Sequence, residues 1–266
     1  ATSTAAVRGG RPPVSGSAKP TGARLITSAC RERAISVTLK EGKRAVSFSR
    51  AFHRLLDVDT ARFTTLVNDE AFARSLGVEA NNLEGYLSPN TYSFNWQTDE
   101  EEIIGRLVRQ TEKIFDDTLR ERARELKMSL HEVLTLASII EGEALLDDER
   151  AIISGVYHNR LRKGMRLQAD QTIQYIIPDG PRRVVFSDLH INNPYNTYKH
   201  GGLPPGPISN PGVASILAAL YPAQHNYLYF VANGRGGHWF SSNYDGHMNN
   251  VRKFRKERAA RNRDLG

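Results

Sequence analysis

The chain has 266 residues, a mean hydropathy of −0.47 and a formal net charge of +7, which fit a globular protein large enough to bury a sizeable core. The positive charge lies at the two ends, since residues 1–50 carry +8 and residues 251–266 carry +5, which leaves −6 for the segment between them. An acidic central body argues against nucleic acid as the main ligand, because phosphate binding requires clustered cations on the folded surface.

Hydropathy also predicts how the chain relates to membranes. No apolar run approaches the roughly 18 residues that a spanning helix needs, and the first residues lack the apolar block of a secretory signal. The sequence therefore predicts a soluble chain that carries no membrane anchor or export signal. A single cysteine, Cys30, excludes an internal disulfide and leaves the redox compartment open.

The first quarter of the chain is predicted to be a tail followed by a small lobe. Residues 1–34 are rich in Ala, Ser, Gly, Pro and Arg without a hydrophobic period, which predicts a disordered segment or linker. ISVTL, residues 35–39, predicts a short strand, KEGKR is typical of the turn after it, and helices are expected over residues 48–56, 60–68 and 69–76. The lobe is expected to be helical with one hairpin, and no chemistry is visible in it.

Residues 83–94, LEGYLSPNTYSF, crowd aromatic residues, Pro and Asn into a stretch with little regular period. They predict an ordered loop whose Tyr86 and Tyr92 either fill the core or contact a ligand. Residues 98–126 then predict one or two amphipathic helices with a solvated charged face.

The stretch SLHEVLTLASIIEGE, residues 129–143, predicts a helix that brings a carboxylate to the core. Ser129 and Glu132 match a capping box at its start. Apolar residues then recur at three- and four-residue spacing, and Glu141 falls on the stripe that they form. A carboxyl group in apolar surroundings has a raised pKa and can donate a proton near neutral pH, whereas a salt-bridged residue near a helix end is the alternative. Glu143 points to another face and is predicted to be structural.

A second helix is expected over residues 148–162, before Gly164. Residues 166–177 predict loop and strand or a short helix. This segment carries three polar side chains suited to hydroxyls and amides: Gln168, Asp170 and Thr172. Residues 194–212 are the most constrained stretch, because proline fixes backbone dihedrals and glycine supplies unusual ones, so that the Asn, Thr and Tyr between them are held in fixed places.

The last third combines a helix, a hairpin and a basic end. Asn210 and Pro211 are predicted to cap and open a helix that runs to about residue 221. Residues 226–231 predict a buried strand, and residues 238–241 are its expected hairpin partner across ANGRGG. A basic helix is then expected over residues 246–263.

Glu141 is the leading candidate for a chemical group, with Glu143, Glu84 and Asp170 in reserve. Ordinary glycoside hydrolysis needs two carboxylates that flank the bond, and the sequence offers no obvious second one. The histidines lie in no metal-binding spacing, a single cysteine gives no thiolate site, and no nucleophile elbow, phosphate loop or dinucleotide fingerprint is present. We therefore expect neither a metal nor a cofactor.

Several segments, taken in order, resemble a known family. They are LEGYLSPNTY, ASIIEGEA with DDER, GVYHNRLRKGMRLQADQTIQY, YNTYKHGGLPPGPISNPGVASILAALYP, YLYFVANGRGGHWFS and DGHMNNV. Together they are similar to the endolytic murein transglycosylases, the MltG or YceG-like family. The expected fold class is α+β: a mixed helical catalytic domain with a small antiparallel sheet over residues 78–266, preceded by a reduced LysM-like lobe over residues 35–77 and the disordered segment 1–34.

The resemblance implies a lytic transglycosylase that cleaves the MurNAc–GlcNAc β-1,4 bond within peptidoglycan strands without water and that serves strand termination and cell-wall assembly. Glu141 is implied to be the single catalytic acid. It would protonate the glycosidic oxygen and then take the proton of the sugar's C6 hydroxyl, which closes onto C1 to leave a 1,6-anhydroMurNAc end. The implied partners are glycan strands and cell-wall synthases, at the periplasmic face of an inner membrane, where relatives carry an anchor that this chain lacks.

Further residues are implied to line the glycan cleft by their place in these motifs, with loop architecture as the alternative for each. They are Gln168, Asp170, Thr172, Tyr195, Asn196, Thr197, Tyr198, Asn210, His238 and Phe240. Four residues depart from the usual pattern and put the local loop shape in question: Ser88, Asn90, Gln171 and Gly246. A non-catalytic peptidoglycan-binding or scaffold protein, and a hydrolase that pairs Glu141 with another carboxylate, are the alternative functions.

Overall fold

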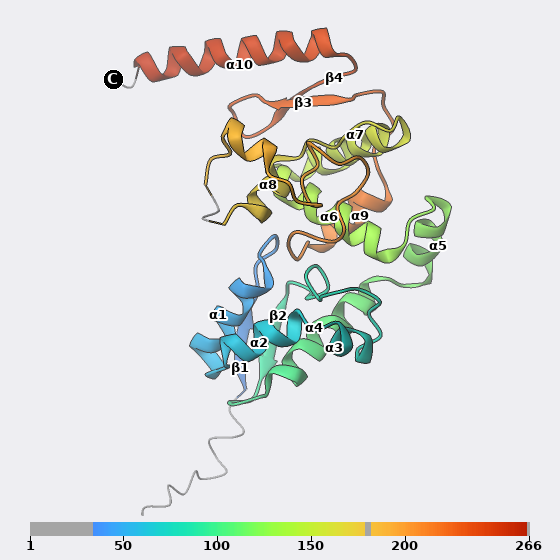
Figure 1. Ribbon diagram of the computed structural model, residues 1–266, viewed down its shortest axis with the longest axis vertical. Helices are drawn as coiled ribbons and strands as arrows, with labels where there is room; N and C mark the ends of the chain where they lie inside the picture. The colour runs from blue at the N-terminus through green and yellow to red at the C-terminus, as the bar shows by residue number, and fades with distance from the viewer. Residues whose placement is uncertain (1–33, 179–181, 265–266) are drawn as a thin grey trace, which may run out of the picture.

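The computed structural model describes residues 34–178 and 182–264, and it contains helices and two small antiparallel sheets (Figure 1). The elements in chain order are β1 (Ile35–Thr38), α1 (Ala45–Leu56), α2 (Thr60–Val67), α3 (Glu70–Ser75), β2 (Thr91–Phe94), α4 (Glu100–Ile114), α5 (Asp117–Glu125), α6 (Leu130–Glu143), η2 (Asp147–Glu149), α7 (Arg150–Arg162), α8 (Asp170–Ile176), η3 (Phe186–His190), α9 (Val213–Leu220), β3 (Tyr229–Ala232), β4 (His238–Ser241) and α10 (Tyr244–Asp264). The mixed helical, α+β prediction is therefore confirmed. The disordered tail predicted for residues 1–34 lies, apart from Ala34, outside the described residues.

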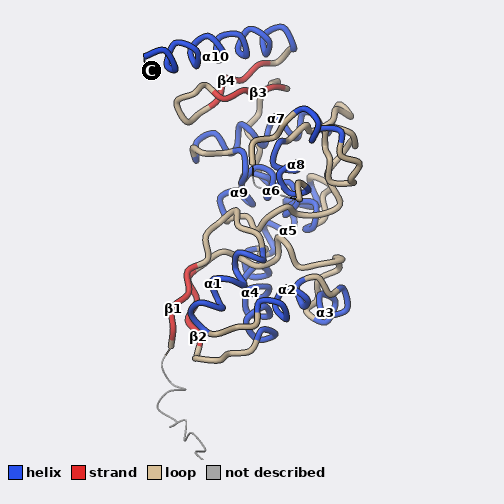
Figure 2. The backbone as a smooth tube through the Cα atoms, turned by 60° about the vertical axis from the view of Figure 1, so that its left-hand side comes forward, coloured by secondary structure: helices blue, strands red, loops and turns tan. Residues whose placement is uncertain are grey.

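Three parts follow one another along the long axis of the molecule (Figures 1 and 2). One end holds β1, β2 and α1 to α4 around a first hydrophobic core, and the middle holds α5 to α9 around a second. The hairpin β3–β4 and the helix α10 form the other end. The first core includes Val37 and Val108, and so extends beyond residue 77, where the lobe was predicted to end.

The first sheet joins two segments that lie far apart in sequence. β1 pairs antiparallel with β2, with Ile35 opposite Phe94 and Thr38 opposite Thr91. The predicted hairpin within the lobe is wrong, because the partner of β1 comes from the stretch that was expected to be a loop. A strand of four residues is too short to show a clear alternation, and its pairing depends on tertiary contacts. Tyr92 lies buried on β2 and fills the core.

Helix α6 is the central element of the middle part. The capping box between Ser129 and Glu132 is present as predicted. The helix does not have one apolar stripe, however, because every residue from Val133 to Ile140 is buried. It packs against α5, α7, α8 and α9, which cover it on several sides. A helix that is buried all round gives no information on which of its faces meets a site.

Two helix starts differ from the prediction. α7 begins at Arg150, because the short helix η2 occupies the preceding three residues. α9 begins at Val213 with Gly212 at the cap position, so the predicted cap by Asn210 is wrong. The Asn210 side chain binds the backbone of another segment instead, as described below.

The last elements follow the prediction closely. β3 and β4 form the expected hairpin, with Tyr229 opposite Ser241 and Ala232 opposite His238. α10 packs on both strands and extends along the end of the molecule (Figure 1). Within the described ranges, no helix is both long and apolar enough to cross a lipid bilayer.

Candidate active site

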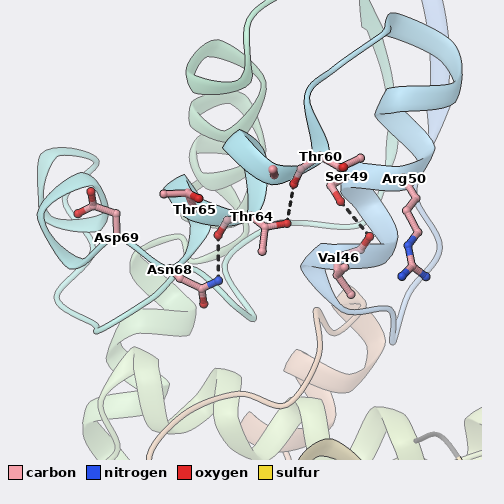
Figure 3. A pocket seen from close by; sticks show the side chains of 9 residues that line it. Val46, Ser49, Arg50, Thr60, Thr64, Thr65, Asn68 and Asp69 are labelled. Atoms are coloured by element: carbon pink, nitrogen blue, oxygen red, sulfur yellow. Dashed lines mark hydrogen bonds between the residues drawn. The ribbon is translucent and has the colours of Figure 1, made fainter. Parts of the chain in front are cut away.

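A surface hollow of about 790 Å³ between α1 and α2 holds none of the predicted site residues (Figure 3). Two of its polar side chains bond to their own helix: Ser49 donates to the Val46 carbonyl at 2.9 Å and Thr64 to the Thr60 carbonyl at 2.7 Å. Both hydroxyls therefore already have a backbone partner.

A second cavity, of about 510 Å³, lies at the C-terminal end of α6 and is called the active-site cavity below. Its walls come from α6, α7, α8, the hairpin and α10, so residues between positions 143 and 247 meet there. The lining residues are Glu143, Arg160, Leu167, Gln168, Asp170, Tyr198, Tyr229, Phe230, Val231, Ala232, His238, Tyr244 and His247. Aromatic walls with a few convergent polar and charged groups are typical of a ligand site.

Glu143 is the carboxyl group with the most suitable environment for acid chemistry in this cavity. Burial, and after it the charge of Asp170, raises the pKa of Glu143 to about 7, and hydrogen bonding from Tyr157 and the Gln171 backbone opposes the rise. A carboxylic acid with that pKa is protonated in a large fraction of molecules near neutral pH and can donate its proton to a bound ligand. Glu143, which was predicted to be structural, is thus part of the lining of this cavity.

Four of the implied cleft residues line the same cavity: Gln168, Asp170, Tyr198 and His238. The Tyr198 hydroxyl donates a short hydrogen bond to Asp170. Burial raises the pKa of Tyr198 far above its usual value, so this phenol stays protonated and remains a donor. His238 is fixed by Glu149, whose carboxylate binds both the His238 Nδ1, at 2.7 Å, and the His238 backbone N–H, at 2.8 Å.

Glu141 lies on the other side of the last turn of α6. Its Oε2 accepts hydrogen bonds from the Ser215 hydroxyl at 2.7 Å, the Gly212 backbone N–H at 3.1 Å and the Arg150 guanidinium at 3.3 Å. Arg150 also donates to Ser215 at 2.6 Å. The expectation of apolar surroundings for Glu141 is therefore wrong, and its alternative, a salt-bridged residue near a helix end, describes the contacts.

The turn between β1 and α1 closes this side of Glu141. Gly42 has a φ of +69°, and a Cβ atom there would lie 3.2 Å from the Glu141 Cγ. The Gly42 backbone N–H donates to the Asn210 carbonyl at 2.8 Å, which holds the turn in place. Glu141 is only 8% exposed on its side chain and is not among the residues that line the active-site cavity. The geometry consequently favours Glu143 over Glu141 as the reacting acid.

Gln171 packs over Gly142, the residue between the two glutamates. A Cβ atom at Gly142 would lie 2.6 Å from the Gln171 Cγ, so only glycine lets the Gln171 side chain pack over this turn. Gln171 is one of the four departures from the family pattern, and here it covers the residue between Glu141 and Glu143.

Three further predicted cleft residues hold the loop instead of facing the cavity. Thr172 and Thr197 are buried and share a hydrogen bond of 2.9 Å, and Thr197 also accepts from the Ala169 backbone N–H at 3.0 Å. Asn196 is fully buried and donates to two carbonyls, those of Leu189 and Ile191. These side chains fit the alternative of loop architecture.

Asn210 joins the first part of the molecule to the middle part. Its Oδ1 accepts from the backbone N–H groups of Gly85, at 2.8 Å, and Leu87, at 3.0 Å. Its Nδ2 donates to the Glu84 carboxyl at 2.7 Å and to the Lys43 carbonyl at 3.0 Å. All four hydrogen-bonding positions of this buried amide are used within the protein, so it is a structural bridge.

Two aromatic predictions lie away from the cavity. The Tyr195 ring packs on Tyr175 with ring centroids 4.8 Å apart, and burial raises the pKa of Tyr195 to about 12. Phe240 packs on Tyr227 and Phe230 against the second core. Neither residue lines the active-site cavity.

Sequence reasoning kept Glu143 only in reserve and did not assign four other polar or aromatic lining residues to the cleft: Arg160, Tyr229, Tyr244 and His247. Arg160 and Tyr229 lie in segments that carry the family resemblance but had no distinctive spacing. Among the described residues, the Nδ1 atom of His247 is buried and has no hydrogen-bond partner. No three His, Cys, Asp or Glu side chains within residues 34–178 and 182–264 converge in a way that suits a metal ion.

The fold and this cavity define a mixed helical protein with an acidic, aromatic-walled site at the end of a buried helix. The sequence profile of the YceG-like family matches residues 16–253, and the chain belongs to this family.

Relatives and a solved structure agree with this membership. A Bacillus subtilis protein named endolytic murein transglycosylase is 35% identical over 244 residues, which are 86% of this chain and 68% of the relative. A Streptococcus pneumoniae protein of the same name is 33% identical over 178 residues, 64% of this chain, and the match covers only 32% of that relative. The crystal structure of a YceG-like protein from Listeria monocytogenes superposes with a TM-score of 0.76 at 35% identity and covers 80% of this chain and 75% of that chain.

Proposed function

We propose that this chain is a lytic transglycosylase that cuts within peptidoglycan strands, as the names of its relatives state for those proteins. The observation that carries the proposal is the Glu143 carboxyl group. It lines a cavity together with Asp170, Tyr198 and His238, and burial raises its pKa to about 7. A protonated acid and several fixed polar groups suit cleavage of a glycosidic bond. Glu141, the acid implied by resemblance, is the competing assignment.

The proposed reaction uses one carboxyl group twice. Protonated Glu143 gives its proton to the glycosidic oxygen, the bond from that oxygen to C1 of MurNAc breaks, and GlcNAc leaves with a free 4-hydroxyl. Glu143, now a carboxylate, takes the proton of the C6 hydroxyl while O6 bonds to C1, which gives a 1,6-anhydroMurNAc end and regenerates the acid. In this proposal, the side chains of Tyr198, Gln168 and His247, which line the cavity, bind hydroxyls and amides of the sugars.

The setting of this reaction belongs to the same proposal. A peptidoglycan substrate places the chain outside the cytoplasm, and strand termination during wall assembly, together with cell-wall synthases as partners, follows from the family resemblance. We further propose that residues 35–77 form a reduced LysM-like lobe and residues 78–266 the catalytic domain. The packing of α1 against both β1 and α2 supports the lobe.

The mass of the products tests the proposal. Digestion of peptidoglycan strands by the full chain is expected to give fragments that end in anhydroMurNAc and are one water lighter than reducing-end fragments. Reducing ends would indicate hydrolysis by a second carboxylate or by water. Strands that bind to the chain and keep their length would instead support the non-catalytic scaffold.

The pH dependence of the rate is expected to report the environment of Glu143. An acid that must be protonated loses activity as pH rises above its pKa, so kcat/KM should fall about tenfold per pH unit above about pH 7. Asp170→Asn removes a negative charge that raises the pKa of Glu143, so the falling limb should move to lower pH. Asp148→Asn, at an exposed position, is the control. An unmoved limb in Asp170→Asn would contradict the assignment of Glu143, whatever the height of the profile.

A further inference from the structure

A third cavity, of about 530 Å³, lies between the hairpin and α10 and is called the hairpin cavity. The lining residues are Leu145, Ala232, Gly234, Gly236, Gly237, His238, Phe254, Arg258 and Arg261. Ala232 and His238 line both this cavity and the active-site cavity, so the two sites adjoin next to the loop of the hairpin. A ligand in one of them therefore lies close to the other.

The α10 side of the hairpin cavity combines an apolar wall with positive charge. Phe254, Arg258 and Arg261 follow at spacings of four and three residues, which places them on one face of the helix. Arg261 donates to the Gly234 carbonyl at 2.6 Å. Arg258 is exposed and makes no hydrogen bond or ion pair with any residue in the described part of the chain. The acidic residue of this helix segment, Glu257, is not among the lining residues.

The opposite wall supplies a neighbouring apolar contact. Leu145, in the loop after α6 and two residues after Glu143, is 77% exposed. Glu149 also lies near this wall, because a Cβ atom at Gly237 would be 2.6 Å from its Oε1. Its carboxylate is engaged by His238, at 2.7 Å, and it does not line the hairpin cavity. The charged side chains that line the hairpin cavity are thus the guanidinium groups of Arg258 and Arg261.

We propose that the hairpin cavity binds a carboxylate of the peptide stems of peptidoglycan, with Arg258 as the main contact; this inference rests on the proposed function. A guanidinium binds a carboxylate through paired hydrogen bonds, and Leu145 and Phe254 pack against the alkyl parts of the peptide. Stem peptides are attached to MurNAc, the sugar whose C1 reacts. A MurNAc unit beside Glu143 therefore carries its peptide near the adjoining hairpin cavity.

Charge reversal at Arg258 tests this site in the full-length chain. The substrates are peptidoglycan strands that carry stem peptides and the same strands after amidase removal of the stems. Arg258→Glu is expected to raise KM for the stem-bearing strands by about tenfold or more and to leave the rate on stem-free strands unchanged. Arg255→Glu is the matched control, because it makes the same charge change on an exposed residue of the same helix outside the cavity. Arg258→Gln removes the charge without reversing it. Equal melting temperatures of both Arg258 variants and the unmodified chain exclude a folding defect.

Each outcome separates this inference from the proposed function. If the unmodified chain forms anhydro ends and Arg258→Glu behaves like Arg255→Glu on both substrates, the carboxylate site is rejected and the activity stands. If Arg258→Glu raises KM equally for both substrates, Arg258 does not recognise the stem. If the unmodified chain forms no anhydro ends on either substrate, the proposed function is rejected, and the stem site with it.

Discussion

Glu143→Gln is expected to lower the rate of anhydro-end formation by about 10²–10⁴-fold, the usual contribution of a general acid. Glutamine keeps the shape of the side chain and the lining of the active-site cavity but has no proton to give to the glycosidic oxygen. Because the charged form of Glu143 is disfavoured by burial, a neutral amide at this position should not destabilise the fold. The variant should still bind peptidoglycan in a pull-down.

Glu141→Gln, two residues away on the same helix, is the matched comparison. It removes the ion pair with Arg150, whose side chain is 12% exposed, and so leaves a guanidinium without its nearest buried anion. We expect a stability loss of about 1–3 kcal/mol and a rate within about tenfold of the unmodified chain. Glu132→Gln, at the exposed start of α6, controls for changes to the helix itself and should lose only part of the capping box.

The two rates, measured on one substrate with the melting temperature of each variant, decide between the two glutamates. If Glu141→Gln is as inactive as Glu143→Gln while both remain folded, the assignment of Glu143 fails. If Glu141→Gln alone is inactive, Glu141 is the acid that the family resemblance implied. If only Glu143→Gln is inactive, Glu141 serves to fix the last turn of α6 through Arg150, Ser215 and Gly212.

The sequence was sufficient to find helix α6 and its beginning, because the capping box is a local signal between Ser129 and Glu132. It was also sufficient to show that Glu141 and Glu143 lie on different faces. The prediction took the apolar face as the one that meets the site, an inference that holds for a half-exposed helix but not for a helix buried all round. The cavity is made by α7, α8, the hairpin and α10, and no local pattern in α6 shows where those elements pack.

Family resemblance found what spacing did not, namely that Gln168, Asp170, Tyr198 and His238 come together. It did not separate these residues from Thr172, Asn196 and Thr197, which lie in the same motifs. A side chain that holds a loop and one that the loop presents to a ligand share a sequence neighbourhood and a polar character. Only burial and hydrogen-bond partners distinguish them, and both are tertiary properties.

The N-terminal part shows the same limit. β1 was recognised from its composition, but its partner β2 was not, since the two strands are joined through three helices. The contact of the Gly42 turn with Glu141 was also invisible in the sequence. It follows that residues predicted to form a lobe without chemistry contact the helix that carries the proposed acid.

Asn210→Ala is expected to destabilise the fold by about 2–4 kcal/mol, because the amide is the common partner of two backbone donors, a carbonyl and a carboxyl group. Alanine leaves the N–H groups of Gly85 and Leu87 buried without acceptors and removes the donor to Glu84. It also weakens the attachment of the Lys43 backbone, next to the Gly42 turn. Urea unfolding measures the loss, and Asn68→Ala, at an exposed helix end, should change stability by less than about 0.5 kcal/mol.

The size of this loss is expected to depend on pH through Glu84. Burial raises the pKa of Glu84 to about 7, while the Ala45 N–H, Arg44 and the Asn210 amide oppose the rise. A group whose pKa is raised by folding stabilises the fold while it is protonated. This contribution is lost as pH rises from the pKa of the group in the unfolded chain towards its folded pKa of about 7. Without Asn210 the pKa of Glu84 rises further, so more stability is lost above pH 7. The Asn210→Ala deficit should therefore be larger at about pH 8 than at about pH 5.5, and the difference should vanish in the Glu84→Gln background, where no carboxylate titrates. A deficit that is equal at both pH values would show that Asn210 acts through the backbone donors alone.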